Sequence, residues 1–211
     1  MSKTQTSEKK YNEYDNYAFH PYNVLLTLLL FGITALFLSF STAFIYSRVQ
    51  SELPPIKLPS IFIFNTLILI GSSATMVWAK KTYEEDNTQR YQQALLATIL
   101  LSLLFPILQF IGWRSLFQQD IFFNSDNSAS YLYVISGLHF AHVIGGLPFL
   151  GLFLHQAYKQ MTEPINVLIY FSDPEKKLKL RLLTVYWHFI DGLWIYLVLF
   201  FWVNCFIWTA S

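Results

Sequence analysis

The sequence predicts an all-α membrane protein, a bundle of five transmembrane helices, and three observations lead to that class. Hydrophobic residues make up 54% of the 211 residues and charged residues only 13%, about half the charged share of ordinary soluble domains. Five apolar runs are long enough to cross a hydrocarbon core, which needs about 20 helical residues. The alternation of a β-barrel is missing, and continuous apolar runs favour helices because a helix satisfies its own backbone hydrogen bonds.

The expected organisation is one polar tail and one transmembrane domain. Residues 1–20 are polar and charged, unlike a cleaved signal peptide or an Arg-rich transit peptide, so we expect the first span to remain in the mature protein. Residues 21–211 form a single domain, because the connecting loops are too short to fold separately. The five expected spans are residues 24–46, 61–79, 94–111, 131–154 and 182–207.

Positive charge predicts the topology, because short loops rich in Lys and Arg stay on the cytoplasmic side. Eleven of the 14 Lys and Arg residues lie in the tail, in the second loop, or in the fourth loop together with the adjoining Arg181, and the other three are Arg48, Lys57 and Arg114. The N-terminus is thus expected inside and the C-terminus outside. A net charge of +1 provides no basic face for a nucleic-acid partner. The lone cysteine, Cys205, excludes an intrachain disulfide and a metal site built from this chain's cysteines.

The loops differ in character along the chain. The first, from Ser51 to Pro59, contains three prolines and should be a stiff connection. The second, from Lys80 to Arg90, mixes both charge signs and should be a solvated turn. The third, residues 114–130, and the fourth, residues 156–180, are longer and carry polar turn residues. Either of these two could dock a partner subunit, because loops of this length are often functional.

The second span carries a stripe of small and hydrogen-bonding residues. Asn65, Ser72, Met76 and Ala79 follow one another at spacings of seven, four and three residues, so they share one helix face. Membrane helix interfaces are enriched in such residues, which permit close approach and interhelical hydrogen bonds. We expect this face to contact other helices.

The fourth span presents two different faces. Gly137, Ala141 and Gly145 repeat at four-residue intervals, a pattern that lets a neighbouring backbone approach closely. His139 and His142 lie on a stripe rotated away from these small residues. We therefore expect both sides of this helix to contact other parts of the protein rather than lipid.

The fifth span places ionisable residues on one stripe. Thr184, His188 and Asp191 are separated by four and three residues, so His188 and Asp191 are within side-chain reach of each other. A hydrogen bond between them would lower the cost of burying both. Trp187 and Trp194 flank this stripe and should pack in the helix bundle.

Three interpretations of the membrane histidines remain open at this point: haem or metal ligands, a proton relay, or buried hydrogen bonds at helix or subunit interfaces. Ionisable side chains in a span cost about 2.5–3.5 kcal/mol on insertion scales and often mark function. A bis-histidine haem site needs ligands on facing helices, whereas His139 and His142 share one helix. A relay needs a chain of ionisable groups, and Asp191 is the only carboxylate deep in a span.

We favour the third interpretation, and no motif for nucleotide binding, nucleophilic catalysis or zinc binding is present. We therefore expect no catalytic, cofactor-binding or metal-binding residue in this chain. The candidates for buried polar or interface contacts are His139, His142, His188, Asp191, Asn65 and Gln109, and the candidates for helix packing are Gly137, Ala141 and Gly145.

Several motifs resemble one known family. The order Gly-x-His-x-x-His-Val-x-x-Gly from Gly137 to Gly146, followed by Tyr-Trp-His-Phe-x-Asp-x-x-Trp from Tyr186 to Trp194, resembles subunit III of the haem–copper terminal oxidases, the cytochrome c and quinol oxidases of respiratory chains. The resemblance covers about the last four-fifths of the chain. It also includes Pro59, Asn65-Thr66-Leu67-Ile68-Leu69, Ser72-Ser73-Ala74-Thr75, Gln109 and Trp113.

The resemblance implies a non-catalytic subunit of a proton-pumping oxidase complex in aerobic respiration. Such a subunit packs on the catalytic subunit I, in one complex with subunit II, and supports stability, sustained turnover and proton uptake. Haem and copper are expected in the partner subunits and not in this chain. Membrane phospholipids are expected partners, and a respiratory supercomplex is a further candidate. We expect the protein to lie in a bacterial cytoplasmic, or inner, membrane.

The chain departs from the family pattern at three points. Longer members have seven helices, with two extra ones enclosing a phospholipid cleft, whereas this chain resembles the five-helix form. Many members place a glutamate after a serine in the helix matching the first span, where Ser39 is here followed by Phe40. Gly112 stands where many members have an acidic residue.

Two rivals from other classes are a haem-binding membrane anchor of a respiratory dehydrogenase and a transporter. The anchor also uses few helices with buried histidines, and its isolated subunit would carry haem. A transporter would show repeat symmetry and helices broken near the membrane midplane, and the sequence shows neither pattern.

Overall fold

The computed structural model describes residues 20–51 and 58–210, with side chains for 20–50 and 58–206. Within these ranges the chain is helical and contains no strand. The helices are α1 (Pro21–Ser51), α2 (Ile61–Glu84), α3 (Thr88–Phe117), α4 (Asn127–Gln160), α5 (Pro164–Ser172) and α6 (Pro174–Ala210). Most of the tail predicted for residues 1–20, and Pro54 and Pro55 of the first loop, lie outside the described residues.

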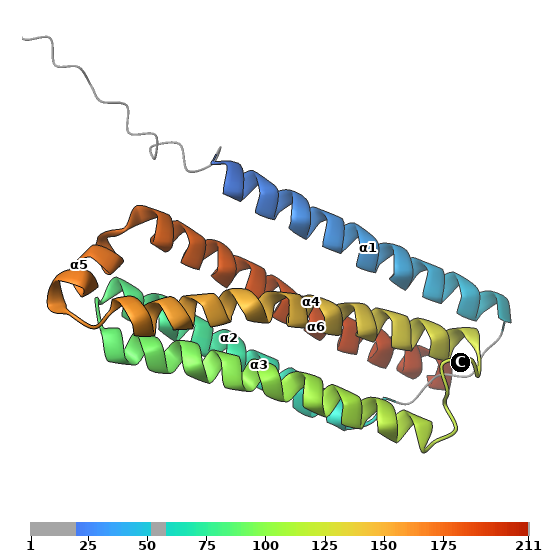
Figure 1. The fold of residues 1–211 in the computed structure, drawn as a ribbon. Helices are drawn as coiled ribbons and strands as arrows, with labels where there is room; N and C mark the ends of the chain where they lie inside the picture. Colours follow the sequence, from blue (N-terminus) through green and yellow to red (C-terminus); the bar gives the residue numbers. More distant parts are fainter. Residues whose placement is uncertain (1–19, 52–57, 211) are drawn as a thin grey trace, which may run out of the picture.

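Five of these helices, α1 to α4 and α6, are long and apolar enough to cross a membrane. The all-α class with five spans is therefore confirmed. Each helix extends beyond the span predicted for it, because polar residues at the ends continue the helical turns outside the apolar run. The spans run side by side as one elongated bundle, in which α1 begins and α6 ends at opposite ends (Figure 1).

Short-range contacts fix where the long helices begin. The side chain of Asn87 accepts a hydrogen bond of 3.1 Å from the backbone N–H of Arg90 at the start of α3, and Asp126 accepts one of 2.7 Å from Ala129 at the start of α4. Such caps satisfy backbone donors that have no partner within the helix. Pro106 and Pro148 lie inside α3 and α4, a placement that membrane helices tolerate.

Four helices, α2, α3, α4 and α6, form a closed ring in which each contacts its two neighbours, and α1 packs on the outside against α4 and α6. Two groups of buried residues fill the bundle. One surrounds Phe37, Phe105 and Trp194, and the other surrounds Tyr83, Tyr91 and the residues of α5 that point inward. The stripe predicted on the second span lies inside this ring, because Asn65, Ser72, Met76 and Ala79 are all fully buried.

Glycine allows close packing at two points of the ring. A Cβ atom at Gly112 of α3 would lie 3.0 Å from the Cγ2 atom of Ile61 and 3.1 Å from the Phe62 ring on α2. A Cβ atom at Gly146 of α4 would lie 2.6 Å from the Trp187 ring and 3.0 Å from the Tyr186 ring on α6. Both glycines therefore let a large side chain of a neighbouring helix lie directly on a helix backbone.

The small residues predicted to mediate close packing on the fourth span have a different environment. Nothing lies within 4 Å of where a Cβ atom would stand at Gly137 or Gly145, so the expected close approach is not made there by the described part of this chain. The closely packed glycine of α4 is Gly146, one residue away and about 100° around the helix. The periodicity of small residues could not reveal this, because it does not show which face meets the bulky rings of α6.

The first prediction concerns Gly146. Replacing Gly146 with Val should lower the stability of the protein by about 1–3 kcal/mol, the usual cost of overpacking, because the new side chain would overlap the Trp187 and Tyr186 rings. The measurement is the midpoint of thermal unfolding of the purified protein in mild detergent. Gly145→Val is the matched control, with open space at the same depth, and equal midpoints for the two variants would contradict the proposed packing.

Candidate functional site

Except for His142, the predicted polar residues lie in contacts between the four helices of the ring. Between α2 and α3, the Nδ2 group of Asn65 donates a hydrogen bond of 2.9 Å to the Oε1 atom of Gln109, and both side chains are fully buried. About two helical turns from this amide pair, the hydroxyls of Ser72 on α2 and Ser102 on α3 lie 3.0 Å apart. An unpaired amide in hydrocarbon costs several kcal/mol, so each of these side chains requires its partner.

The contact between α2 and α6 contains the ionisable pair predicted on the fifth span. His188 hydrogen-bonds through Nδ1 with the Ser73 hydroxyl, and the carboxyl group of Asp191 lies near the same hydroxyl. The sequence predicts a direct bond between His188 and Asp191, whereas the structure places Ser73 between them. At the same interface, the Nε1 group of Trp187 donates a hydrogen bond of 2.9 Å to the hydroxyl of Ser72. Asp191 is only 4% exposed, so this contact lies inside the protein.

The two histidines of α4 have separate roles. His139 is fully buried and donates through Nε2 to the backbone carbonyl of Ile190 on α6, 3.1 Å away. Its ring lies 4.8 Å from the ring of Trp194 and 5.4 Å from the ring of Phe105, measured between centroids. His142 instead donates through Nδ1 to the carbonyl of Leu138 in its own helix, at 2.7 Å. The hydrogen bond of His139 therefore joins two helices, whereas that of His142 stays within α4 and its ring lies 5.9 Å from the ring of Phe37 on α1, between centroids.

Two further bonds complete the ring. The Nε1 group of Trp113 on α3 donates a hydrogen bond of 3.0 Å to the hydroxyl of Ser136 on α4. The Tyr186 hydroxyl on α6 donates one of 2.9 Å to the backbone carbonyl of His142 on α4. Sequence reasoning did not assign these donors. A buried tryptophan or tyrosine usually finds an acceptor for its N–H or O–H, and that tendency indicates both donors, although the buried Nε1 group of Trp194 has no hydrogen-bond partner in the part of the chain that the structure describes.

The histidines and the amides thus each make at least one hydrogen bond within this chain, while one buried polar atom each of Asn65, Gln109, His139 and Asp191 has no hydrogen-bond partner within the described ranges. Among the described residues, no group of three or more His, Cys, Asp and Glu side chains could hold a metal ion. What the arrangement can do is hold four helices in a fixed register, since each interhelical hydrogen bond contributes about 0.6 kcal/mol on average.

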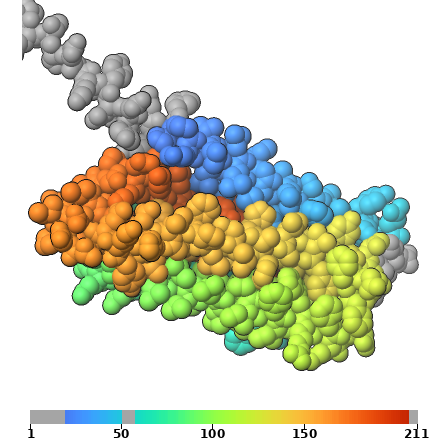
Figure 2. All heavy atoms as spheres, in the orientation of Figure 1, coloured from blue at the N-terminus to red at the C-terminus, as the bar shows by residue number. Residues whose placement is uncertain are grey.

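A groove lies on the outside of the ring, between α1, α4 and α6. Its cavity measures about 740 Å³, and Figure 2 shows the hollow between α1 and the surfaces of α4 and α6. Its walls are largely apolar, with the small residues Ala141 and Gly145 of the fourth-span stripe on one side and Leu25 and Leu29 of α1 on the other. The stripe predicted to meet a backbone therefore faces an open groove.

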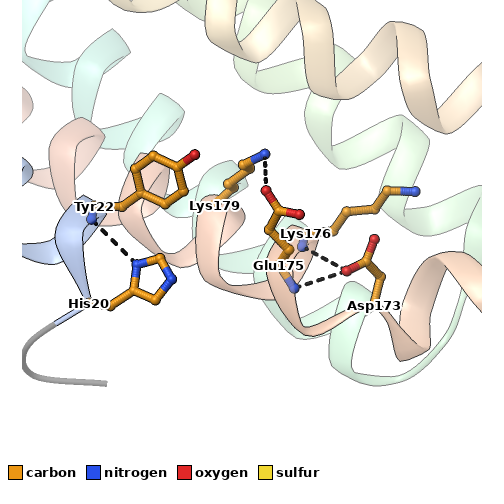
Figure 3. A network of polar contacts seen from close by, with 6 residues as sticks. All are labelled: His20, Tyr22, Asp173, Glu175, Lys176 and Lys179. Atoms are coloured by element: carbon orange, nitrogen blue, oxygen red, sulfur yellow. Dashed lines mark hydrogen bonds and ion pairs between the residues drawn. The ribbon is translucent and has the colours of Figure 1, made fainter. Parts of the chain in front are cut away.

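Charged residues gather where this groove meets one end of the bundle (Figure 3). Lys179 forms an ion pair of 2.6 Å with Glu175, and its Nζ atom lies 5.8 Å from the centre of the Tyr22 ring. Lys176 donates a hydrogen bond of 2.6 Å to the side-chain oxygen of Gln160. The carboxylate of Asp173 accepts hydrogen bonds from the backbone N–H groups of Glu175 and Lys176 at the start of α6. The mouth of the groove thus carries two lysines and two carboxylates above apolar walls.

Comparisons with known proteins agree with this architecture. The model of the family described as "Cytochrome c oxidase subunit III" matches residues 22–210. The proteins named cytochrome c oxidase subunit 3 from Pan troglodytes and Homo sapiens are each 30% identical to this chain over 147 residues, which is 70% of this chain and 50% of the relative. The protein of that name from Aedes aegypti is 29% identical over 193 residues, 84% of this chain and 68% of the relative.

This chain spans about half the length of the mammalian relatives it matches. The family match nevertheless covers α2, α3, α4 and α6 and nearly all of α1. It includes the stretch around His139 and His142 and the stretch around His188 and Asp191. The chain therefore belongs to the cytochrome c oxidase subunit III family.

Proposed function

We propose that this chain is a non-catalytic subunit of a proton-pumping haem–copper terminal oxidase, and that it packs on the catalytic subunit I in a complex that includes subunit II. The single observation that carries the proposal is the family match over residues 22–210. The buried geometry supports it, because the ionisable side chains of the spans act as links between helices. Its contribution is to support the stability, sustained turnover and proton uptake of the catalytic subunit.

Redox chemistry belongs, in this proposal, to the partner subunits, which carry haem and copper. The rival assignment, a haem-binding anchor of a respiratory dehydrogenase, is not favoured by the relatives. In addition, His139 and His188 each use a ring nitrogen to bind a group on another helix. We place the protein in a bacterial cytoplasmic membrane. The distribution of Lys and Arg favours an orientation with the N-terminus inside and the C-terminus outside. A respiratory supercomplex remains a candidate for the larger assembly.

Membrane phospholipids are part of the same proposal. The groove between α1, α4 and α6 offers apolar walls to acyl chains, and Lys176 and Lys179 at its mouth offer positive charge to a phosphate. Asp173 and Glu175 beside them suit the ammonium group of a zwitterionic headgroup. The proton-uptake effect has no support from the first span, because the glutamate of many family members is absent after Ser39.

The second prediction tests the proposed complex. Affinity purification of the tagged protein in mild detergent should yield oxidase subunits I and II, identified by mass spectrometry, and an absorption spectrum with haem. After dissociation of the complex, the haem should stay with subunit I. Retention of a haem Soret band by this chain alone would favour the dehydrogenase anchor and would reject the proposal.

The third prediction concerns the contact at Ser73. Replacing Asp191 or His188 with Leu should weaken assembly more than it changes turnover per assembled enzyme. Each change removes one polar neighbour of the Ser73 hydroxyl, and a hydrogen bond contributes about 0.5–1.5 kcal/mol to stability. The measurements are the subunit content of the purified complex and the turnover per haem. Val185→Leu, at an exposed position of the same helix, is the control; variants with full subunit content but without turnover would contradict the structural role.

The fourth prediction concerns the mouth of the groove. Lys176→Gln combined with Lys179→Gln should reduce the phospholipid retained by the purified protein, because a lysine near a lipid surface contributes about 1 kcal/mol. Native mass spectrometry measures the retained lipid. Lys81→Gln, which removes an exposed lysine of α2 paired with Glu85, is the control. Equal lipid retention in the double variant and the control would exclude a headgroup site at these lysines.

A further inference from the structure

The helix α5, which the sequence did not reveal, has features that the proposed function does not use. It lies within the segment predicted to be the polar fourth loop, between the end of α4 and the start of α6, at the end of the bundle where α2 ends and α3 begins (Figure 1). With nine residues, Pro164–Ser172, it is about 13 Å long and cannot cross a membrane. Pro164 begins it, and prolines are favoured at that first helical position.

One face of α5 is fixed to the bundle. Tyr170 and Phe171 are buried, and the Tyr83 hydroxyl of α2 donates 3.1 Å to the backbone carbonyl of Tyr170. The ring of Phe171 lies 5.0 Å from the ring of Tyr83, between centroids, and Lys176 lies 4.0 Å above the ring of Tyr170. The orientation of the helix about its own axis is therefore set by aromatic packing.

The opposite face of α5 is aliphatic and exposed. Ile165, Leu168 and Ile169 are 71%, 67% and 62% exposed. Their spacings of three and four residues place them within an arc of about 100°, on the side away from Tyr170 and Phe171. Because the inward face is held by its contacts, α5 cannot rotate to bury these three side chains against its own chain.

The depth of α5 is fixed by the helices on either side. The apolar run of α4 ends at Leu154, and α4 itself ends at Gln160, six residues or about 9 Å further along the axis. The headgroup layer on each side of a bilayer is about 5–8 Å thick. The exposed aromatic rings of Tyr158 on α4 and Tyr22 on α1 mark the same level, since such rings gather at membrane surfaces. These lengths bring α5 to the headgroup layer.

We propose that α5 lies along the membrane surface and inserts Ile165, Leu168 and Ile169 into the boundary between lipid headgroups and acyl chains. Interfacial helices bind membranes in this manner, with the apolar face buried about 5–10 Å into that boundary. The exposed lysines Lys159 and Lys177 near its two ends suit the anionic surface of the cytoplasmic leaflet. α5 is thus a second, interfacial contact with the lipid.

A lipid fits this face better than a protein partner does. Specific protein interfaces involve roughly 20–30 residues a side and draw their binding energy mainly from Trp, Tyr and Arg. The exposed face of α5 offers three branched aliphatic side chains, while its aromatic residues, Tyr170 and Phe171, are turned inward. The inference rests on the transmembrane architecture alone and not on the assignment to an oxidase complex.

The fifth prediction tests this placement by spin labelling. In a Cys205→Ser background, single cysteines replace Ile165, Leu168 or Ile169, and the labelled full-length protein is reconstituted, with the subunits that purify with it, in phospholipid nanodiscs. Power saturation compares the accessibility of each label to oxygen, which concentrates in lipid, and to a water-soluble nickel chelate. The ratio of oxygen to nickel accessibility should be several-fold higher at these three positions than at Asn166→Cys, the exposed polar control on the same helix.

Two outcomes would overturn the proposal. Strong nickel accessibility at all three positions would place the aliphatic face in water, and exclusion of both reagents would mean that a protein covers it. Both results are distinguishable from failure of the proposed function, because the co-purified subunits are identified in the same sample. Labelling at three separate exposed positions guards against disruption of the helix by any one substitution.

Discussion

The structure depends on one constraint: a polar side chain inside a membrane bundle must find its partner on another part of the protein, since hydrocarbon offers none. Four helices meet this constraint by pairing with each other in a closed ring. Asn65 with Gln109 links α2 to α3, Trp113 with Ser136 links α3 to α4, His139 links α4 to α6, and Ser73 with His188 links α6 back to α2. Each bond is weak in isolation, but sliding any helix along its axis would break the bonds on both of its sides at once. Apolar packing alone would resist such a shift far less, because one leucine contact can replace another.

The relation of α1 to this ring explains the groove. α1 packs mainly against α4 and α6, and near its C-terminal end Arg48 donates a hydrogen bond of 2.8 Å to the backbone carbonyl of Asn204 on α6. The hydroxyls of Thr27, Thr34, Ser39 and Thr42 donate to carbonyls of α1 itself and so do not link it to the ring in these contacts. Toward the N-terminal end of α1, the small residues Ala141 and Gly145 leave space on the facing surface of α4.

The sequence was sufficient for the class and the number of spans, because long apolar runs are required to cross a membrane. Of the polar candidates, Asn65, Gln109, His139 and Asp191 are buried, whereas His142 and His188 are half-buried. The sequence was not sufficient for the pairings. His188 and Asp191 lie on one stripe of α6, as the helical spacing predicts, yet both lie beside Ser73 of another helix. Helical periodicity contains no information about a neighbouring helix.

The same limit applies to glycine: Gly145 and Gly146 are adjacent, and only the positions of Tyr186 and Trp187 decide which of them is tightly packed. The short helix α5 was missed because nine residues between polar turns give too few turns for a convincing helical period.

The hydroxyl of Ser72 lies 3.0 Å from that of Ser102 on α3 and accepts the Trp187 N–H of α6, so three helices meet at one oxygen atom. α2 and α3 are consecutive and joined by a short turn, and their shared amide and serine contacts can form as soon as that hairpin has left the ribosome. α6 is the last of the six helices to be synthesised. The ring can therefore close only after α6 has been synthesised, when Trp187 and His188 reach Ser72 and Ser73 on a hairpin that is already in the membrane. Until then, α2 and α4 have no helix between them on that side of the ring.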